Sequence, residues 1–318
     1  MKKNEILNYI YKYEKIIIHG HSRPDGDCYG AQLGLKNIII ENFPNKEVYA
    51  VGEKSEYVDF LGQFDEIDDS TYKDALSVVV DTAVSDRISE KRYKLGKEVL
   101  KIDHHIDVEE YGDYNFVDTS YPAASEIITD LAVANKLRIN IKGATALYTG
   151  IVTDTGRFRY RGVSGRTHIL VSHLINSGAD LEIVNNNLGQ ENIKSMKLKG
   201  YVYSNFITTK GGFIYIKMNN QILKEYGVSK ETASSMVNLL GGLEGHPVWA
   251  LMIEHEDQIR VRLRSNGPKI SDVAAKFSGG GHARASGATL KSWSELDKFI
   301  QEIEKEIIKY KSEVQKWF

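Results

Sequence analysis

Histidine and aspartate side chains gather in one short stretch near the N-terminus, which has the sequence HSRPDGD from His21 to Asp27. His21, Asp25 and Asp27 can together bind a divalent cation, because imidazole and carboxylate oxygens suit Mn²⁺, Mg²⁺ or Zn²⁺. Pro24 fixes its own φ and Gly26 permits a tight path, so both carboxylates can turn to the same side of this loop. A polar turn with a stray histidine is the alternative interpretation of the stretch.

Segments that predict buried strands come shortly before the residues able to bind metal. The run at 16–18 precedes His21, the run at 76–80 ends on Asp81, and the run at 98–102 ends on Asp103, His104 and His105. A further short strand is expected at 47–51 and helices at 31–40 and 123–136. This alternation predicts an α/β fold with a doubly wound, mainly parallel sheet, in which ligands bind beyond the carboxyl ends of the strands. We therefore expect these side chains to meet at one edge of the sheet.

Another carboxylate follows a segment that is apolar almost all round. Residues 144–152 predict a buried helix, which runs into the sequence TDTG at 153–156 that contains Asp154. Its alternative role is to cap a neighbouring turn. The next residues, RFRYR at 157–161, alternate cations with aromatic rings. On a strand, Phe158 and Tyr160 would lie on one face and the arginines on the other, or the segment would be an exposed charged edge strand.

Composition limits the classes of protein that this chain can represent. Its 318 residues, 42% of them hydrophobic, are enough for roughly two domains of about 150 residues each. No apolar stretch approaches the roughly 20 residues that span a bilayer, and the N-terminus lacks the pattern of a secretory signal. A single cysteine excludes an internal disulfide and predicts the cytoplasm as the compartment. The net charge of −2 argues against a protein that coats long nucleic acid.

The second half of the chain predicts a separate domain. A polar, Asn-rich and partly helical segment at 185–205 is the expected linker, which leaves residues 1–184 as the first domain and 206–318 as the second. Runs at 213–218 and 248–253 predict strands, and 258–264 alternates apolar residues with arginines, as a half-buried antiparallel strand does. A helix at 270–277 is expected to end at the glycine-rich segment 279–287, GGGHARASG, and 293–318 predicts an amphipathic terminal helix.

The motifs HSRPDGD, DTA at 81–83, DHH at 103–105, TDTGRF at 153–158 and GGGHARASG resemble, in this order, those of the DHH phosphoesterases. The resemblance covers the whole chain. It is most specific to the bacterial group of oligoribonucleases and pAp phosphatases, which includes soluble phosphodiesterases of c-di-AMP and pApA. It implies a catalytic DHH domain followed by a smaller α/β DHH-associated domain with a mixed sheet. Cys28 departs from the family pattern, in which a small residue such as Ala is more usual, and is expected to act as a small hydrophobic residue.

The resemblance implies two divalent ions, Mn²⁺ first, with Mg²⁺ or Co²⁺ as alternatives. The implied ligands are His21, Asp25 and Asp81 for one ion, and Asp27, Asp81, His104 and Asp154 for the other. Asp81 would then bridge the two. The charge count agrees, because four aspartates carry a charge of about −4 that two divalent ions cancel, whereas without cations the carboxylates repel one another.

The resemblance also implies roles for residues around the ions. Asp103 would fix the orientation of a histidine, His105 would face the substrate phosphate, and Arg23 would join them as a catalytic residue. The implied substrate-binding residues are Arg157, Arg264, Ser265, Asn266, Gly280, Gly281, His282 and Ser286. A basic strand face and a capped helix end are the structural alternatives for Arg264 and His282.

Together these features predict a hydrolase that cleaves short RNA or nucleotide substrates, with water attacking phosphorus between two metal ions. The substrates implied are nanoRNA, pApA, pAp and c-di-AMP, with no membrane or long duplex partner and a homodimer by resemblance. Three alternatives remain. A family II inorganic pyrophosphatase would carry a Ser-Arg-Lys-Lys clamp, which the second domain lacks, and a RecJ-like exonuclease would bring additional nucleic-acid-binding parts. A non-catalytic nucleotide sensor would not need the full metal set.

Overall fold

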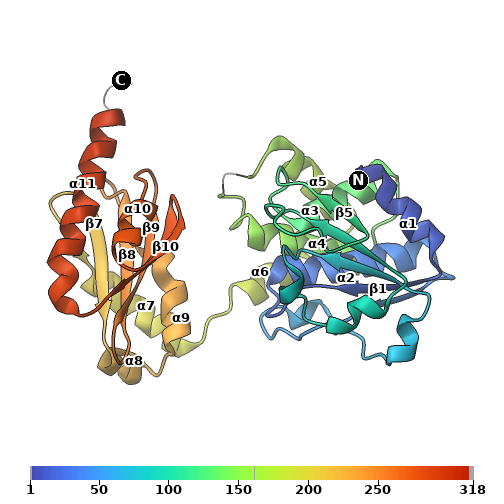
Figure 1. Ribbon diagram of the computed structural model, residues 1–318, viewed down its shortest axis with the longest axis horizontal. Coiled ribbons are helices and arrows are strands. Elements are labelled where there is room, and N and C mark those ends of the chain that lie inside the picture. The colour runs from blue at the N-terminus through green and yellow to red at the C-terminus, as the bar shows by residue number, and fades with distance from the viewer. Residues whose placement is uncertain (1, 161, 315–318) are drawn as a thin grey trace. The chain divides into compact units, whose positions relative to one another are not determined.

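The computed structural model describes residues 2–160 and 162–314, and the chain divides into two compact units between Gln190 and Glu191. Each unit has its own sheet (Figure 1) and its own hydrophobic core. The division falls inside the expected linker at 185–205, but most of that range is helical. Helix α6 (Leu181–Leu188) belongs to the first unit, and α7 (Ile193–Asn205) packs Leu198 and Val202 into a core of the second.

The first unit is built on a five-stranded sheet in the order β2-β1-β3-β4-β5, with every pairing parallel. Its strands are β1 (Lys15–His19), β2 (Glu47–Ala50), β3 (Leu76–Val80), β4 (Glu98–Asp103) and β5 (Tyr114–Val117). This confirms the predicted parallel α/β fold, and β5 is a strand that the sequence did not predict. Because β1 lies between β2 and β3, the direction of winding reverses there, which is where parallel sheets bind their ligands.

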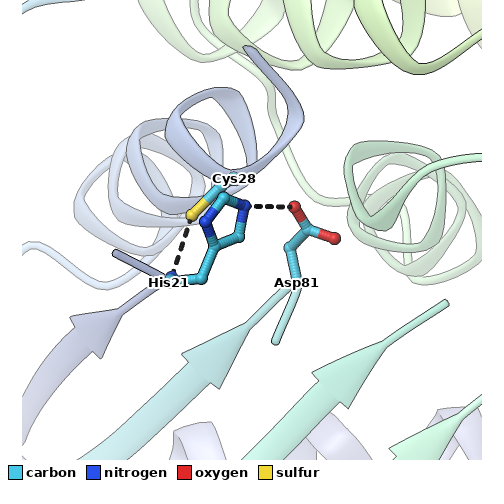
Figure 2. A group of neighbouring side chains, drawn as sticks. All are labelled: His21, Cys28 and Asp81. Atoms are coloured by element: carbon cyan, nitrogen blue, oxygen red, sulfur yellow. Dashed lines mark hydrogen bonds and ion pairs between the residues drawn. The ribbon is translucent and has the colours of Figure 1, made fainter. Parts of the chain in front are cut away.

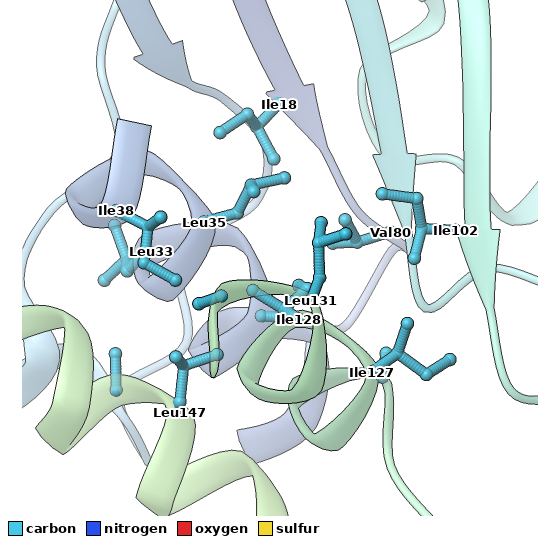
Figure 3. Close-up of a cluster of buried hydrophobic side chains, with 14 of the residues drawn as sticks. Ile18, Leu33, Leu35, Ile38, Val80, Ile102, Ile127, Ile128, Leu131 and Leu147 are labelled. Atoms are coloured by element: carbon cyan, nitrogen blue, oxygen red, sulfur yellow. The ribbon is translucent and has the colours of Figure 1, made fainter. Parts of the chain in front are cut away.

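Helices cover one face of this sheet and enclose the main core. They are α1 (Ile6–Lys12), α2 (Gly26–Asn42), α3 (Ala124–Ala134), α4 (Ile141–Asp154) and α5 (Gly165–Asn176), with α6 after them. Figure 3 shows apolar side chains of α2 and α3 beside Ile18, Val80 and Ile102 from the strands, and Leu147 of α4 belongs to the same cluster. Short 3₁₀ turns lie in the connections: η1 (Lys3–Glu5), η2 (Asp59–Leu61), η3 (Asp69–Tyr72), η4 (Ser85–Arg87) and η5 (Lys91–Leu95). Smaller clusters that include Tyr72 and Tyr93 cover the other face of the sheet.

Helix α2 begins five residues before the expected start at residue 31, at Gly26. The reason is Asp25, whose Oδ1 accepts hydrogen bonds from the amides of Asp27 and Cys28 at 3.1 Å each and so caps the helix. Gly30 then lets α2 approach α4, because a Cβ on Gly30 would lie 2.4 Å from the carbonyl oxygen of Ala146. The early start therefore places Asp27 inside a helix that packs tightly against α4.

The segment 157–161 is not a strand, in contrast to the expectation from its alternating residues. Residues 155–160 form turns after α4, with Arg157 and Phe158 at φ values of 58° and 62°, and Arg161 lies outside the described residues. Thr155 explains the turn: its carbonyl accepts from the amides of Arg159 and Tyr160, and its hydroxyl accepts from the amide of Phe158.

The second unit contains a mixed six-stranded sheet in the order β10-β11-β9-β8-β7-β6, in which only β7 and β8 are parallel. The strands are β6 (Ile207–Thr208), β7 (Phe213–Met218), β8 (Val248–Glu254), β9 (Ile259–Ser265), β10 (Gly280–His282) and β11 (Ala285–Leu290). The mixed sheet confirms the predicted α/β class. The helix expected at 270–277 does end before the glycine-rich segment, since it covers Ser271–Lys276. The segment itself forms the β10–β11 hairpin, which the sequence did not predict.

Both faces of the second sheet are covered by helices. Helices α10 (Ser271–Lys276) and α11 (Leu296–Val314), with η7 (Trp293–Glu295) before α11, pack on one face. Helices α7, α8 (Asn220–Tyr226) and α9 (Lys230–Ser235), with η6 (Met236–Leu240), cover the opposite face. In β9, Ile259, Val261 and Leu263 are buried in the core shared with α11, as their alternation with arginines predicts. Residues 315–318 of the expected terminal helix lie outside the described residues.

Within the described part of the chain, no helix combines the length and the apolar character that crossing a membrane requires.

Candidate metal centre

The side chains predicted to bind metal do meet at the carboxyl edge of the first sheet. His21 follows β1, Asp81 follows β3, and Asp103 and His104 come at the end of β4 and just beyond it. Asp81 turns sharply out of its strand with a φ of 51°, a conformation that costs a non-glycine residue free energy and is often found at functional sites. The parallel arrangement of the strands thus brings residues far apart in sequence to one place.

His21 directs one ring nitrogen at carboxylates and the other at the backbone. Its Nδ1 lies 2.9 Å from the carbonyl oxygen of Ser22, whereas Nε2 lies 3.6 Å from Oδ2 of Asp81 and 3.7 Å from Oδ1 of Asp25. Figure 2 shows the His21 ring facing one oxygen of Asp81, while the other oxygen points away from it. The Sγ atom of Cys28 accepts a hydrogen bond from the His21 amide at 3.2 Å, and burial raises the pKa of this thiol to about 12.

His104 repeats this arrangement on the other side of Asp81. Its Nδ1 lies 3.3 Å from the carbonyl oxygen of Tyr121, and its Nε2 lies 3.2 Å from Oδ1 of Asp81, 3.3 Å from Oδ2 of Asp154 and 3.8 Å from Oδ2 of Asp27. A histidine that donates Nδ1–H to a carbonyl presents the Nε2 lone pair to a metal. The two oxygens of Asp81 therefore face two histidines that are both arranged as ligands.

Asp27 is held by the start of another helix. Its Oδ2 accepts from the amide of Ala124 at 2.6 Å and its Oδ1 from the amide of Ser125 at 2.9 Å, both in the first turn of α3. Gly150 of α4 leaves room for this contact, because a Cβ there would lie 2.7 Å from Oδ1 of Asp27 and 2.0 Å from the Ser125 hydroxyl. The position of Asp27 thus depends on three packed helices.

The crowded carboxylates have strongly perturbed pKa values. Burial and the neighbouring Asp81 raise the pKa of Asp27 to about 7, and burial together with Asp27 and Asp81 raises the pKa of Asp154 to about 9. Burial lowers the pKa of His104, but the carboxylates of Asp81 and Asp27 outweigh it and raise the value to about 10. Burial likewise opposes ionisation of His21, yet Asp25 and Asp81 raise its pKa well above the usual value. Without a cation, bound protons therefore have to offset the repulsion between these carboxylates.

The donor set fits divalent cations. Among the described residues, Oδ1 of Asp81 and Nε2 of His104 are buried and have no hydrogen-bond partner, and an unpartnered buried polar atom is costly. A cation between these atoms would satisfy them and cancel the carboxylate charge. Ligand atoms of Asp27, His104 and Asp154 lie within 4.8 Å of one another, as do those of His21 and Asp81. Oxygen and imidazole ligands of this kind suit Mn²⁺, Mg²⁺ or Zn²⁺.

Asp103 contacts the backbone and His105 rather than the cluster of ligand atoms. Its Oδ1 accepts from Nδ1 of His105 at 2.8 Å and from the amides of His104 at 2.9 Å and His105 at 3.3 Å. The side-chain hydrogen bond to Asp103 raises the pKa of His105. Burial raises the pKa of Asp103, but the hydrogen bonds and the charge of His105 outweigh it and hold the pKa of Asp103 below the usual range. The side chain of His105 is 45% exposed, so it can reach a molecule in solution.

Two other residues implied for the first domain are not brought into this cluster. The Arg23 side chain is exposed, and its backbone amide donates to Oε2 of Glu53 at 2.7 Å. Arg157 is also exposed and donates from Nη1 to Oδ1 of Asn185 in α6 at 2.8 Å. Their roles in catalysis and substrate binding stay predictions.

The residues implied to bind substrate in the second unit gather at the end of β9 and in the β10–β11 hairpin. Arg264 pairs with Ala285 in the strand register, and His282 pairs with the same alanine from the other side. The hydroxyls of Ser265 and Ser286 are buried and donate to the carbonyls of Pro268 and His282, at 2.7 Å each. These two serines therefore fix the local backbone. Gly280, Gly281 and His282 are exposed, and Asn266 donates its amide to the Pro247 carbonyl at 2.8 Å.

Comparison with known proteins decides the family. A sequence model of the N-terminal domain of the DHH family matches residues 15–151, and a DHHA1 domain model matches residues 210–309. The bifunctional oligoribonuclease and PAP phosphatase NrnA of Bacillus subtilis is 38% identical over 305 residues, which are 95% of this chain and 97% of the relative. The chain belongs to the DHH family.

Two further proteins are similar to this chain. The probable bifunctional oligoribonuclease and PAP phosphatase NrnA of Streptococcus mutans is 40% identical over 299 residues, covering 94% of this chain and 96% of the relative. The crystal structure of an exopolyphosphatase-related protein from Bacteroides fragilis superimposes with a TM-score of 0.80 at 23% identity, over 98% of this chain and 97% of that one. The latter similarity concerns the fold alone.

The DHH unit also contains polar contacts that the motifs did not reveal. The carbonyl of Tyr121 orients His104, and the amides of Ala124 and Ser125 orient Asp27. Such contacts cannot be predicted from residue types, because every residue has the same backbone carbonyl and nearly every residue has a backbone amide N–H. Lys101 is different, because a lysine in the middle of a strand that is buried almost throughout is a visible signal of a buried cation with a partner.

Proposed function

We propose that this chain is a metal-dependent phosphoesterase that hydrolyses short oligoribonucleotides and linear dinucleotides such as pApA to mononucleotides, and pAp to AMP. The observation that carries the proposal is the position of Asp81, whose two carboxylate oxygens lie 3.6 Å from Nε2 of His21 and 3.2 Å from Nε2 of His104. This is the arrangement that a carboxylate shared by two cations requires. The activities for which the two NrnA relatives are named agree with the substrates proposed.

The residues of the first unit have distinct roles in this proposal. His21, Asp25 and Asp81 would hold one cation, and Asp27, Asp81, His104 and Asp154 would hold the second. Two such ions supply charge neutralisation at the phosphoryl group and activation of a water nucleophile. The hydrogen bond from His105 to Asp103 fixes the ring of His105 so that Nε2 is directed to the substrate phosphate, and burial of Asp27 and Asp81 keeps the ligand geometry rigid.

The second unit supplies substrate binding in this proposal. Arg264 and His282 would contact phosphate or nucleotide, because the hairpin glycines expose the backbone beside them and two cationic or polar side chains flank Ala285. A charge-assisted hydrogen bond to phosphate contributes about 1.5–3 kcal/mol. Their loss should thus weaken substrate binding and leave the metal ligands in place.

We further propose Mn²⁺ as the working metal, with Mg²⁺ or Co²⁺ as alternatives, a homodimer in solution, and the cytoplasm as the working compartment. The single, buried cysteine supports the last point, because nothing in this chain depends on oxidation to a disulfide. Light scattering of the purified protein measures the oligomeric state. Activity after exchange into each metal measures the preference.

One experiment tests the substrate class. The purified protein with Mn²⁺ is incubated with pApA, oligoribonucleotides of two to five residues, pAp, c-di-AMP and pyrophosphate, and the products are identified by chromatography. We expect AMP from pApA and pAp, and no turnover by Asp81→Asn under the same conditions. Phosphate release from pyrophosphate alone would refute the nucleotide assignment, and tight nucleotide binding without any turnover would indicate a sensor.

A further inference from the structure

Lys101 is a fully buried lysine in β4, the strand that ends at the candidate metal centre. It lies in β4, two residues before Asp103, and its side chain has an exposed fraction of 0%. Lysine is almost never buried this completely unless its charge is paired, because transfer of an ammonium group out of water is costly. The contacts of its Nζ atom should therefore indicate the role of this buried charge.

The ammonium group contacts two different loops of the metal centre. Nζ donates to the carbonyl oxygen of Ala83 at 3.1 Å, in the loop that follows Asp81. It also donates to the carbonyl oxygen of Glu109 at 3.0 Å and lies 3.4 Å from Oδ1 of Asp107, both in the loop that follows the DHH motif. Lys101 thus connects the loop that carries the shared carboxylate to the loop that carries the second histidine ligand.

Further hydrogen bonds join the same two loops. Oε1 and Oε2 of Glu109 accept from the hydroxyl and amide of Ser85 at 2.7 Å and 2.9 Å, and the hydroxyl of Tyr111 donates to the carbonyl of Thr82 at 2.7 Å. Nζ of Lys101 lies 4.9 Å from the centre of the Tyr111 ring. The lysine is therefore at the centre of a hydrogen-bond network that joins both loops.

Lys101 is also the charged partner of Asp103. Oδ1 of Asp103 accepts the three hydrogen bonds from the DHH loop, whereas Oδ2 is buried, has no hydrogen-bond partner among the described residues, and lies 3.8 Å from Nζ of Lys101. The two oxygens of the carboxylate therefore have different partners, the DHH loop for Oδ1 and Lys101 for Oδ2. This pairing fixes the orientation of the Asp103 carboxylate in which Oδ1 faces Nδ1 of His105.

We propose that Lys101 is a positioning residue of the phosphoesterase centre, which acts by joining the Asp81 loop to the DHH loop and by orienting Asp103. The catalytic part of this inference rests on the proposed function. Its structural part, the fixed placement of both loops, does not. Lys101 touches no candidate metal ligand directly, so its effect must pass through the loops and Asp103.

A matched control is available in the same unit. Lys46 is also almost buried, with 8% of its side chain exposed, donates to the carbonyls of Tyr11 and Tyr13 at 3.2 Å and 2.6 Å, and lies 3.9 Å from Oε1 of Glu14. It precedes β2 and so lies at the opposite edge of the sheet from the candidate metal centre. Lys101→Met and Lys46→Met each remove one buried ammonium group bonded to two carbonyls while keeping a side chain of similar length.

Three measurements on the full-length protein compare these variants with the wild type: amide hydrogen exchange without metal, Mn²⁺ affinity by calorimetry, and steady-state kinetics with pApA. For Lys101→Met we expect at least 10-fold faster exchange at 81–88 and 103–112, a 10- to 100-fold loss of Mn²⁺ affinity or kcat, and KM changed less than 3-fold. For Lys46→Met we expect normal exchange in both loops and normal Mn²⁺ affinity. Lys101→Gln, which keeps a donor for the carbonyls but lacks the charge, should show the same direction of change if Lys101→Met does not fold.

The double variant Lys101→Met/Asp103→Asn separates positioning from general stability. If Lys101 acts through Asp103, the double variant should be no more than about 3-fold worse in kcat than the worse single variant, because coupled residues are not additive. If the double variant instead lost kcat by the product of the two single losses, an action of Lys101 through Asp103 would be refuted. Exchange rates and Mn²⁺ affinity of Lys101→Met equal to those of Lys46→Met would refute the proposal altogether, whereas a wild type that binds Mn²⁺ without cleaving nucleotides would refute only the proposed function.

Discussion

Asp81→Asn is the substitution that most directly tests whether one carboxylate serves two cations. The change keeps the size of the side chain and removes its charge. Because one oxygen of Asp81 faces His21 at 3.6 Å and the other faces His104 at 3.2 Å, we expect the variant to lose cation binding on both sides. Removal of a residue that belongs to one side alone, as in His21→Ala, should leave the other side able to bind.

The size of the effect follows from the linkage between binding and stability. A cation present at 1,000 times its Kd stabilises the folded state by about 4.1 kcal/mol. In a unit of 150–250 residues each kcal/mol shifts the Tm by about 2–4 °C, so saturation of one site should raise the Tm by roughly 8–16 °C. The wild type should show the contributions of two sites, His21→Ala those of one, and Asp81→Asn a shift under about 2 °C on the same scale.

The assay is thermal unfolding with and without Mn²⁺, after removal of metal by a chelator. Asp113→Asn is the matched control, because Asp113 accepts a hydrogen bond from the amide of Val99 at the amino end of β4, at 2.8 Å, and lies away from the ligands. It should lower the Tm without changing the Mn²⁺-induced shift. A wild-type shift in Asp81→Asn, or equal and complete losses in Asp81→Asn and His21→Ala, would contradict the assignment of Asp81 to both cations.

Three further predictions concern the surroundings of the ligands. Asp103→Asn should lower Mn²⁺ affinity or kcat by about 10- to 100-fold, less than His104→Ala does, and equal losses in two folded variants would make Asp103 a direct ligand. Gly150→Ala should abolish cation binding by calorimetry although no ligand is removed, because the new Cβ would lie 2.7 Å from Oδ1 of Asp27; an unchanged Kd would show that α4 can move aside. Burial and the neighbouring carboxylates raise the pKa of Asp27 to about 7 and that of Asp154 to about 9, so cations must displace protons when they bind. Mn²⁺ affinity should therefore rise from pH 6 to 9, and calorimetry in buffers of different ionisation heat should detect the released protons. A pH-independent affinity would contradict this.

Strands buried on both faces were predictable because their signal is strong. Leu76–Val80 is apolar except for Ser77, every one of its residues is buried, and its predicted limits match β3. β5 has the sequence YNFV, of which only Phe116 is buried, because an edge strand needs no continuous apolar run. The start of α2 was missed because Asp25 acts through a helix cap, which the expected role of a metal ligand obscured.

Residue types predicted which side chains gather, but not how they are held. His21, Asp81 and His104 come together because parallel strands end at one edge, and that follows from sequence order alone. The tilt of each ring depends on carbonyls such as those of Ser22 and Tyr121, which every residue possesses. The hairpin at 280–290 was missed for a related reason, because Gly279 allows a backbone approach in which a Cβ would lie 2.0 Å from the carbonyl oxygen of Gly287.

The distribution of the ligands along the chain has a consequence for synthesis and folding. His21 stands near the beginning of the first unit and Asp154 at the end of α4, and Asp27 is aligned only when α3 and α4 pack on α2. A growing polypeptide therefore lacks a complete centre until α4 has left the ribosome and closed these long-range contacts. Acquisition of metal during translation would then report completion of the whole first unit, and a prematurely ended chain would remain inert towards RNA.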